Sequence, residues 1–332
     1  MAASPDSTRC PSPLASPAVI TICVATLLTL TADLGLRSGA SYAFGLFLFA
    51  PFAAGFASTV LGSEGRGWRT KSVFGWTVGL LATTFLLALA AGTDGAICLL
   101  MAAPLSCFAA ATGTLLGMGV ARLARWGDGN GRSGGGSRLS GLLAFPVLWI
   151  GMAVEPSLLP EPPLRAVTTS VIIDATPEAV WDTVIAFPPL TSPPEGVLRL
   201  GIAYPVGATL EGEGVGAVRR CEFSTGTFVE PVTVWRPGEL LAFDVLEQPA
   251  PMTETSPWED LDVPHLSGSF ASEKGEFRLT PTADGKLHLQ GTTWYRQHLW
   301  PQVYWNEIAD GLVHRIHGRV LDHVAACAEA TG

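Results

Sequence analysis

The sequence predicts a helical membrane region followed by a water-facing α+β domain, in which a curved antiparallel sheet surrounds one long C-terminal helix. Three observations predict this fold class. Residues 38–63, 72–93 and 95–121 contain no charged residue. Residues 1–165 carry ten Lys and Arg against seven Asp and Glu, whereas residues 166–332 carry ten against 22. The second half also alternates between apolar and polar residues, as strands do, and ends in a helical pattern.

The three uncharged stretches are each at least 22 residues long, and a bilayer core requires about 20 helical residues. We therefore expect a membrane region over residues 18–159, after a disordered N-terminus at residues 1–17. It should contain four to five helices, at approximately 18–36, 42–62, 73–92, 96–121 and 139–156. Three glycines, Gly113, Gly117 and Gly119, suit close helix–helix contact, although glycine is also frequent in membrane helices in general.

Positive residues orient these helices, because loops rich in Lys and Arg stay in the cytoplasm. One such loop contains Arg66, Arg69 and Lys71, another contains Arg122, Arg125, Arg132 and Arg138, and the loop at Asp94 has none. The sequence thus predicts a multi-pass protein of the cell membrane with a cytoplasmic N-terminus. With five spans the C-terminal domain is extracytoplasmic, which we favour; with four it is cytoplasmic.

A Pro-rich spacer at residues 160–165 connects the membrane region to the C-terminal domain. The domain should begin with a strand at 166–175 and a helix that Thr176 caps and that ends before Pro188. Further strands are expected at 216–223, 227–235, 239–247, 274–281 and 286–296, and a final helix at about 301–329. A curved sheet around one helix tends to leave an elongated apolar pocket.

The opening VTTSVIIDATPEAVWDTVIAF resembles the first strand and helix of the START-like (SRPBCC, Bet v 1-like) superfamily, which includes polyketide cyclases/dehydrases and lipid-transfer domains. The whole chain resembles a group of polyketide cyclase/dehydrase-like bacterial membrane proteins, through GAICLLMAAPL, GVGAVRRCEFSTGTFVEPVTVW, PHLSGSF and GTTWYRQHLWPQVYW. The resemblance implies a helix-grip fold over residues 166–330 with a ligand pocket, and no particular reaction. The insertion at residues 248–270 is long for this fold, so we expect a lid or a shield at the pocket mouth.

Candidate catalytic residues lie on the last predicted helix. Asp310, His314 and His317 fall within an arc of roughly 60°, at about 100° per residue. They suit proton transfer, or a divalent metal with His265 or His298 completing its ligands. The alternative, which we favour over a metal, is an ordinary polar helix face, and no cofactor is predicted.

Candidate ligand-binding residues lie on two strands and in an aromatic group. Alternation places Arg220 and Glu222 on one face of their strand, and Glu230 among apolar residues on the next. Arg220 is the best candidate for holding a carboxylate or phosphate, unless these charges form salt bridges on a solvated face. Further candidates are Trp294, Trp300, Tyr304, His265 and His298, whereas Trp305 is expected in the core.

The favoured function is a membrane-anchored START-like domain that binds a hydrophobic small molecule or lipid and exchanges it with the bilayer. The alternatives are a cyclase/dehydrase-type enzyme acting on a hydrophobic polyketide-like substrate, and a sensor or assembly protein without catalysis. The expected partners are the lipid bilayer and the ligand. The acidic C-terminal half argues against nucleic acid as a partner.

Overall fold

The structure is a computed structural model that describes residues 17–37, 42–62, 70–127, 134–258, 266 and 268–331. The chain divides into two compact units. The helical unit comprises Met1–Leu159 and Ser256–Glu259, and the sheet unit comprises Pro160–Thr255 and Asp260–Gly332. The expected disordered N-terminus and the positive residues Arg66, Arg69 and Arg132 lie outside the described residues, so their predictions stay predictions.

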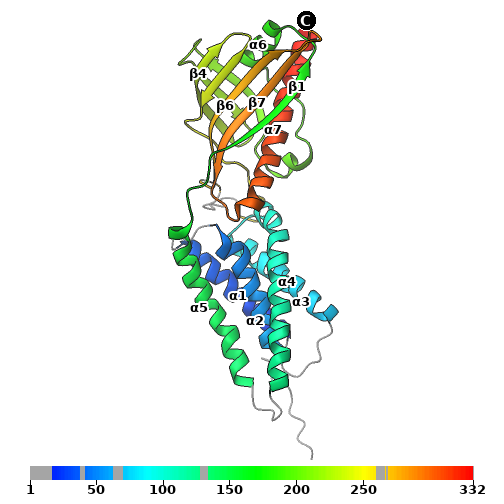
Figure 1. Cartoon of the computed structure of the whole chain (residues 1–332), viewed down its shortest axis with the longest axis vertical. Helices are drawn as coiled ribbons and strands as arrows, with labels where there is room; N and C mark the ends of the chain where they lie inside the picture. Colours follow the sequence, from blue (N-terminus) through cyan, green and yellow to red (C-terminus); the bar gives the residue numbers. More distant parts are fainter. Residues whose placement is uncertain are drawn as a thin grey trace, which may run out of the picture. The chain divides into compact units, whose positions relative to one another are not determined.

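In its described residues, the helical unit contains five α-helices and the short π-helix η2 (Gly45–Phe49) (Figure 1). The α-helices are α1 (Pro17–Arg37), α2 (Ala50–Gly62), α3 (Thr70–Ala91), α4 (Ala96–Gly127) and α5 (Gly134–Leu158). Small side chains fill much of the interior of this unit, including Ala25, Ala50, Ala54 and Ala57. Small residues let helix backbones approach closely, which explains how these helices pack with few large side chains between them.

Glycines on α4 determine how closely α4 packs on α2. A Cβ atom at Gly113 would overlap the carbonyl oxygen of Phe52, and one at Gly117 would lie 3.0 Å from the carbonyl oxygen of Phe56. Both predictions of close helix contact are confirmed. For Gly119 the alternative of general glycine enrichment fits better, since a Cβ atom there would meet no atom of the described residues within 4 Å.

One helix in the described part of the chain, Ala96–Leu123, is long and apolar enough to cross a membrane. Three other apolar helices, Ile22–Gly35, Gly45–Val60 and Gly75–Ala91, are shorter. The expected bundle of four or five spans is therefore not shown by the structure, and membrane insertion remains a proposal.

The sheet unit is a seven-stranded antiparallel sheet in the order β1-β7-β6-β5-β4-β3-β2. The strands are β1 (Arg165–Ile173), β2 (Pro205–Glu211), β3 (Val218–Phe223), β4 (Gly226–Arg236), β5 (Leu240–Asp244), β6 (Phe270–Pro281) and β7 (Leu287–Gln297). The helices are α6 (Pro177–Ala186), the 3-10 helix η3 (Gly196–Leu200) and α7 (Gln302–Thr331). The prediction of a curved antiparallel sheet with a long C-terminal helix is confirmed.

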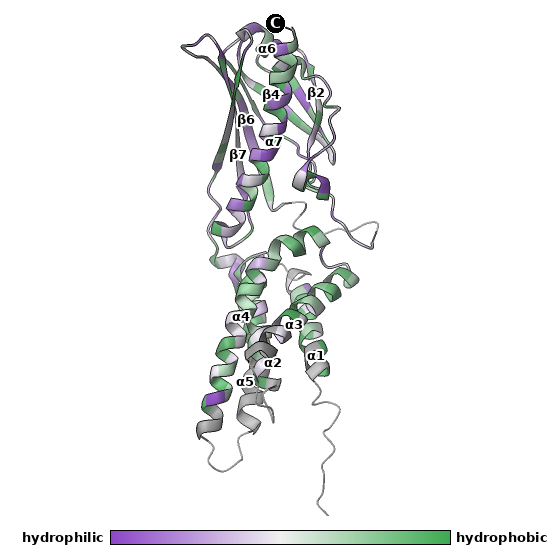
Figure 2. Cartoon of the chain, turned by 90° about the vertical axis from the view of Figure 1, so that its right-hand side faces the viewer, coloured by the Kyte–Doolittle hydropathy of each residue, from purple (hydrophilic) through white to green (hydrophobic). Residues whose placement is uncertain are grey.

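Helix α7 packs on β1 and β7 and also contacts β2, which lies at the opposite edge of the sheet. One helix can touch both edges only if the sheet curls around it, and Figure 2 shows α7 in front of the curved strands. The main core lies between the sheet, α6 and the C-terminal part of α7, and includes Ile173, Val180, Leu241, Leu321 and Val324. A smaller core of Val167, Tyr295 and Val313 lies nearer the start of α7.

Local sequence signals explain most element boundaries. The hydroxyl of Thr176 accepts a hydrogen bond from the backbone N–H of Ala179 (3.3 Å), as expected of the cap of α6. Gly238 and Gly285 adopt positive φ angles in the turns that join β4 to β5 and β6 to β7. Strand β2 was not predicted, because Pro205 and Gly207 within it are poor strand formers.

Candidate functional site

Asp310 is held by two partners on the strands beside α7. Its Oδ2 accepts a hydrogen bond from Nη2 of Arg165 on β1 (2.5 Å), and its Oδ1 accepts one from the hydroxyl of Tyr295 on β7 (2.5 Å). Tyr295 is fully buried, and burial, followed by the neighbouring carboxylate, raises its pKa. Asp310 thus fastens α7 to the sheet.

His314 and His317 form a separate group with two threonines. The Nδ1 atoms of both histidines lie within hydrogen-bond distance of Thr169 Oγ1, at 2.8 and 3.1 Å, and Nε2 of His317 lies 2.8 Å from Thr293 Oγ1. Because a hydroxyl carries one proton, Thr169 donates to one histidine and accepts from the other. Burial, followed by the neighbouring His314, lowers the pKa of His317 to about 4, so this imidazole is neutral at pH 7.

These contacts divide the predicted set of Asp310, His314 and His317 into two networks. The carboxylate is bonded to Arg165 and Tyr295, whereas the imidazoles are bonded to threonine hydroxyls. A shared metal would need all three ligand atoms around one point. The arrangement matches the alternative of a polar helix face, here turned toward β1 and β7.

Two further charged residues, Arg219 on β3 and Glu230 on β4, lie on the inner face of the sheet. They lie opposite each other in the β3–β4 register and form an ion pair through Nη1 of Arg219 and Oε2 of Glu230. Both are buried, with exposed fractions of 4% and 6%. Burial raises the pKa of Glu230 and Arg219 opposes this shift, so the carboxylate depends on the guanidinium for its charge. Burial also raises the pKa of the nearby Cys221 thiol to about 11.

Three phenyl rings surround the guanidinium of Arg219. The ring centroids of Phe187, Phe243 and Phe277 lie 5.8, 5.3 and 5.8 Å from its Cζ. We call these three residues the phenyl cage. Aromatic faces attract a cation, which partly compensates for the loss of water around it.

Two glycines on the inner face of the sheet make room for the phenyl cage. Gly275 lies opposite Phe243, and a Cβ atom there would lie 2.6 Å from Cε2 of that ring. Gly291 lies opposite Phe277, and its Cβ atom would lie 3.7 Å from Cε1 of that ring. Glycine in a strand interior often marks such close packing, and this signal was available in the sequence.

Arg220 and Glu222 do not point inward, and the alternative of a salt bridge on a solvated face, which the sequence favours, holds for Arg220. Arg220 forms a salt bridge with Glu211 of β2 (2.9 Å), with side chains 43% and 63% exposed, and Glu222 is exposed. Because adjacent strand residues face opposite ways, it is Arg219 that points toward α7. Glu230 does lie on the inner face, as expected. For Arg220, the salt bridge with Glu211 is the alternative that was considered.

The predicted aromatic residues and remaining histidines do not gather at one place. Trp294 lies on the outer face of β7, where the ammonium of Lys274 packs 4.8 Å from its ring centroid, and His298 is exposed. Trp300 and Tyr304 are half-buried near the start of α7. The prediction that Trp305 belongs to the core is confirmed, and His265 lies outside the described residues.

Several apolar side chains on α7 and on the inner face of the sheet are incompletely buried. Leu312, Ile316 and Val320 of the stripe on α7 are half-buried. On the inner face of β3 and β4, Phe223 and Phe228 pack edge to face (4.8 Å between centroids) and are also half-buried. The apolar lining expected of a ligand site is therefore present on both sides.

The chain between α6 and β2 is fixed to α7 by two side chains. Arg319 donates hydrogen bonds to the carbonyl oxygens of Ser192 (2.5 Å) and Pro193 (3.1 Å), and its Cζ lies 5.4 Å from the Tyr204 ring centroid. His323 Nε2 lies 2.8 Å from the carbonyl oxygen of Pro188. We call residues 187–204 the α6–β2 loop, and these contacts close one side of the space between sheet and helix.

The structure describes residues 248–258, 266 and 268–270 of the predicted lid, and the first of these segments is bonded to neighbouring parts of the sheet unit. Ala203 donates its backbone N–H to the carbonyl oxygen of Pro251 (3.0 Å), and Met252 pairs with Ile202 in an isolated bridge. Gln248 bonds the backbone of β6 at Phe270 and Ser272. Whether the insertion moves as a lid remains a prediction.

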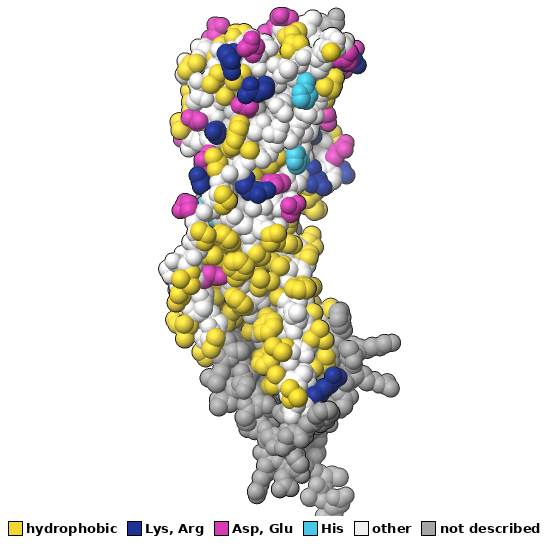
Figure 3. All heavy atoms as spheres, in the orientation of Figure 1, with side chains coloured by type: hydrophobic (Ala, Val, Ile, Leu, Met, Phe, Trp, Pro, Cys, Tyr) yellow, Lys and Arg dark blue, Asp and Glu magenta, His cyan; other side chains and the backbone are white. Residues whose placement is uncertain are grey.

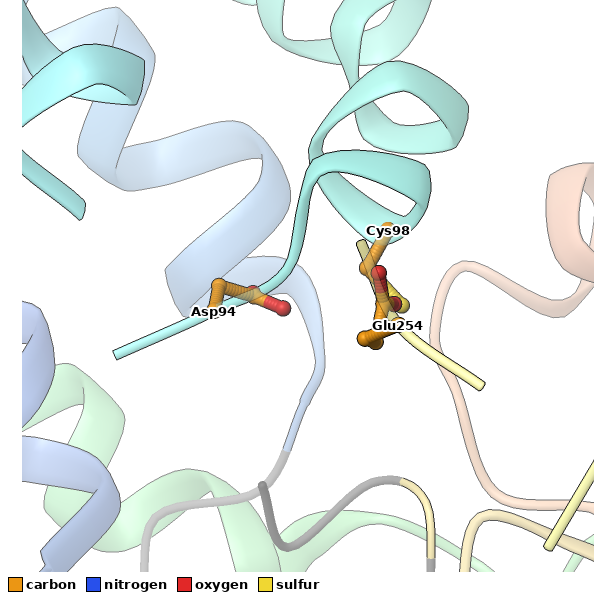
Figure 4. A group of neighbouring side chains, drawn as sticks. All are labelled: Asp94, Cys98 and Glu254. Carbon is orange, nitrogen blue, oxygen red and sulfur yellow. The ribbon is translucent and has the colours of Figure 1, made fainter. Parts of the chain in front are cut away.

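In the helical unit, the start of α4 brings two polar side chains together. Asp94 precedes the helix and Cys98 lies in its first turn (Figure 4), and Asp94 Oδ1 accepts a hydrogen bond from the N–H of Gly95 (3.0 Å). This is the ordinary geometry of a helix start, and we assign no chemistry to it.

Comparisons with known proteins identify solved structures of similar fold and nothing closer. No family model matches the chain, and no curated protein matches it. Zhui aromatase/cyclase from Streptomyces sp. R1128 is 18% identical, with a TM-score of 0.33, over 50% of this chain and 94% of that one. A norcoclaurine synthase mutant from Thalictrum flavum is 13% identical, with a TM-score of 0.34, over 52% of this chain and 99% of that one.

A third match, the di-domain aromatase/cyclase StfQ of the steffimycin biosynthetic pathway, is 10% identical with a TM-score of 0.35. It covers 58% of this chain and 60% of that one. Similarity at this level gives this chain no ligand, substrate or reaction. The function must be argued from its own residues.

Proposed function

We propose that the sheet unit binds an apolar small molecule or lipid between its sheet and α7. The observation that carries the proposal is the half-buried apolar lining on both sides of this space: Leu312, Ile316 and Val320 on α7, and Phe223 and Phe228 on the sheet. Apolar surface that folding leaves accessible gains free energy when a ligand covers it.

Ligand binding is favoured over an enzyme by the pairing of the titratable side chains near this lining. An acid–base catalyst needs a group that can exchange a proton with its substrate. Glu230 is already bonded to Arg219, and Asp310 is bonded to Arg165 and Tyr295. These pairs support a polar anchor in an apolar site better than they support proton transfer.

The helical unit is proposed to anchor the protein in the cell membrane. Support comes from large apolar side chains exposed on its helices, including Leu86, Leu100, Phe108, Leu123 and Val147. Figure 3 shows hydrophobic side chains over much of the visible surface of the described helices. A cytoplasmic N-terminus and an extracytoplasmic sheet unit complete the proposal. A reporter fused after Gly332 that is active only in the cytoplasm would contradict that orientation.

The test of ligand binding uses the full chain in phospholipid nanodiscs. N-phenyl-1-naphthylamine, which fluoresces in apolar surroundings, should bind above the level of empty nanodiscs. Ile316→Trp fills the space beside α7 and should abolish that excess. Ile172→Trp adds the same ring on the outer face of β1, where Ile172 is 50% exposed, and should leave it unchanged. Absence of excess binding by the wild-type chain would refute the proposed function.

Mass spectrometry of molecules that co-purify with gently solubilised protein would identify the natural ligand. We expect an apolar compound that is retained by the wild-type chain and by Ile172→Trp, and lost from Ile316→Trp. Exchange of this compound with the bilayer would follow from tethering, which keeps the site at a high local concentration near the lipid.

A further inference from the structure

The guanidinium of Arg219 retains an unused hydrogen-bond donor. Its Nη1 is bonded to Glu230, but its Nε is buried and has no hydrogen-bond partner among the described residues. A buried N–H group without an acceptor destabilises a protein, because it has lost its water and gained no partner. A ligand oxygen that accepts from this group would remove the cost.

The charge around Arg219 restricts which oxygen can fill that role. Glu230 already supplies one negative charge opposite the guanidinium, and the phenyl cage and the Cys221 thiol lie beside it. A carboxylate or phosphate would add a second negative charge in an apolar environment, close to the first. An uncharged carbonyl, ester or ether oxygen accepts the hydrogen bond without that penalty.

Access to Arg219 requires one ring of the phenyl cage to move. Phe243 and Phe277 lie on β5 and β6, whose backbones are held on both sides by neighbouring strands. Phe187 instead begins the α6–β2 loop and has a φ angle of 30°, a left-handed conformation that is strained for a residue with a side chain. Phe187 is therefore the ring that a ligand can displace at the lowest cost.

We infer that the site takes an apolar ligand with an uncharged oxygen acceptor, which replaces the Phe187 ring beside Arg219 and accepts its Nε–H. This inference rests on the proposed function, because the ligand must first enter between the sheet and α7. It names the ligand class as ketones, esters or ethers with a large apolar part, and it excludes a fatty-acid carboxylate at this position.

Three probes of the same size test the inference: 2-acetylnaphthalene with a carbonyl, 2-ethylnaphthalene without one, and 2-naphthoate with a carboxylate. Each is used to displace N-phenyl-1-naphthylamine from the full chain in nanodiscs. The altered protein is Arg219→Met with Glu230→Gln, which removes both charges and leaves no buried ion unpaired. Comparing each probe between proteins cancels its partition into lipid.

The double variant should bind 2-acetylnaphthalene about tenfold more weakly than the wild type, the value of a hydrogen bond from a charged donor. Its affinity for 2-ethylnaphthalene should change less than about twofold, because this hydrocarbon accepts no hydrogen bond and the apolar lining of the site is retained. The matched control, Arg220→Met with Glu211→Gln, removes the exposed pair on the opposite face of β3 and should change neither affinity.

Two results would overturn the inference while leaving the proposed function intact. One is equal loss, or no loss, of affinity for the ketone and the hydrocarbon in the double variant. The other is tighter binding of 2-naphthoate than of the ketone, with a dependence on Arg219, which would show an anionic ligand. Failure of all probes to bind, by contrast, would refute the proposed function itself.

A measurement on the wild-type chain alone covers the case in which the double variant does not fold. The infrared carbonyl stretch of ¹³C-labelled 2-acetylnaphthalene should shift to lower wavenumber when bound, relative to the probe in empty nanodiscs, because a hydrogen bond from a guanidinium weakens the C=O bond. A bound carbonyl stretch at the value found in empty nanodiscs would also overturn the inference.

Discussion

The helical unit buries small side chains and exposes large apolar ones, whereas the sheet unit buries large side chains and exposes charged ones. Ala54 and Ala57 are fully buried in the first, while Phe108 on its surface is 68% exposed. In the second, Phe187, Leu241 and Tyr295 are almost fully buried, and Arg220 and Glu222 face outward. The contrast supports the proposed membrane anchor, because helices that pack through small residues suit lipid, whereas an apolar core below a charged surface suits water.

The largest change in stability is expected from removing one partner of the buried ion pair in the sheet unit. Arg219→Met leaves Glu230 buried without its partner and should destabilise β3 and β4 by about 3–5 kcal/mol. Adding Glu230→Gln should recover most of that loss, because no charge is then left in the interior. The free energy of local opening, measured by hydrogen exchange of the full chain, provides the comparison.

The control for that experiment is Arg220→Met, one residue further along β3. Its salt bridge with Glu211 is exposed to water and should contribute about 0–1 kcal/mol. Equal effects of the Arg219 and Arg220 substitutions on stability would show that the interior of the sheet unit is not apolar. The sheet unit would then lack the apolar core that distinguishes it in the comparison with the helical unit.

More of this site could be predicted from the sequence than the alternation of apolar and polar residues alone indicates. The strands around Ser224 and Thr225 form a hairpin, and pairing Phe223 with Gly226 places Arg219 opposite Glu230. A glutamate among apolar residues needs a cation opposite, which identifies Arg219 in preference to Arg220. What the sequence could not provide is the position of Phe187, because its contact with Arg219 depends on how the α6–β2 loop folds back over the sheet.

The fold shows the same difference. Features that depend on neighbouring residues in the sequence were predictable, whereas features that depend on residues far apart in the sequence were not. The cap at Thr176, the turns at Gly238 and Gly285 and the stripe on α7 are local patterns, and each was predictable. The short strand β2 was missed because its pairing with β3 overrides the low strand propensity of Pro205 and Gly207. The close contact of α4 with α2 depends on which glycine faces a neighbour, so Gly113 could not be distinguished from Gly119 by composition.

Acid should weaken the sheet unit through His317. Its pKa is about 4 in the folded chain and about 6.5 in an unfolded one. The unfolded state therefore binds the proton first as the pH falls from 6.5 to 4, and stability falls with it, by at most about 3 kcal/mol. Hydrogen exchange of β7 and α7, corrected for the intrinsic rate at each pH, measures the loss.

His317→Gln should remove most of this acid sensitivity, whereas His314→Gln, at an exposed position, should retain it. The helical unit contains no histidine, so exchange in α2 and α4 should show no such step at these pH values. A matching acid transition in both units would argue against His317 as its origin.

Close helix contact in the other unit can be tested with one methyl group. Gly113→Ala should destabilise the packing of α4 on α2 by about 1–3 kcal/mol, because its Cβ overlaps the Phe52 carbonyl oxygen. Gly119→Ala should stabilise α4 by up to about 1 kcal/mol, because alanine favours helices and the position is open. Retention of folded protein after heating, measured by size-exclusion chromatography, reports both changes. If the two alanines behave alike, backbone contact does not determine this packing.

The smallest expected difference compares two threonine pairs, one in each unit. The hydroxyls of Thr77 and Thr114 are 2.9 Å apart between α3 and α4 and are buried. Those of Thr168 and Thr292 are 3.0 Å apart between β1 and β7, on the outer face of the sheet. Thr77→Val should cost about 0.6 kcal/mol, the average for hydrogen bonds between membrane helices, because the hydroxyl left behind has no water to bond.

Thr292→Val should change stability by less than about 0.5 kcal/mol, since the hydroxyl left behind is that of the exposed Thr168, where water can replace the hydrogen bond, and valine suits a strand as well as threonine does. Hydrogen exchange of α3 and β1 in the full chain resolves the two effects. A larger loss on the sheet than between the helices would mean that water reaches the helix interior, and the helical unit would then be packed for water despite its apolar surface.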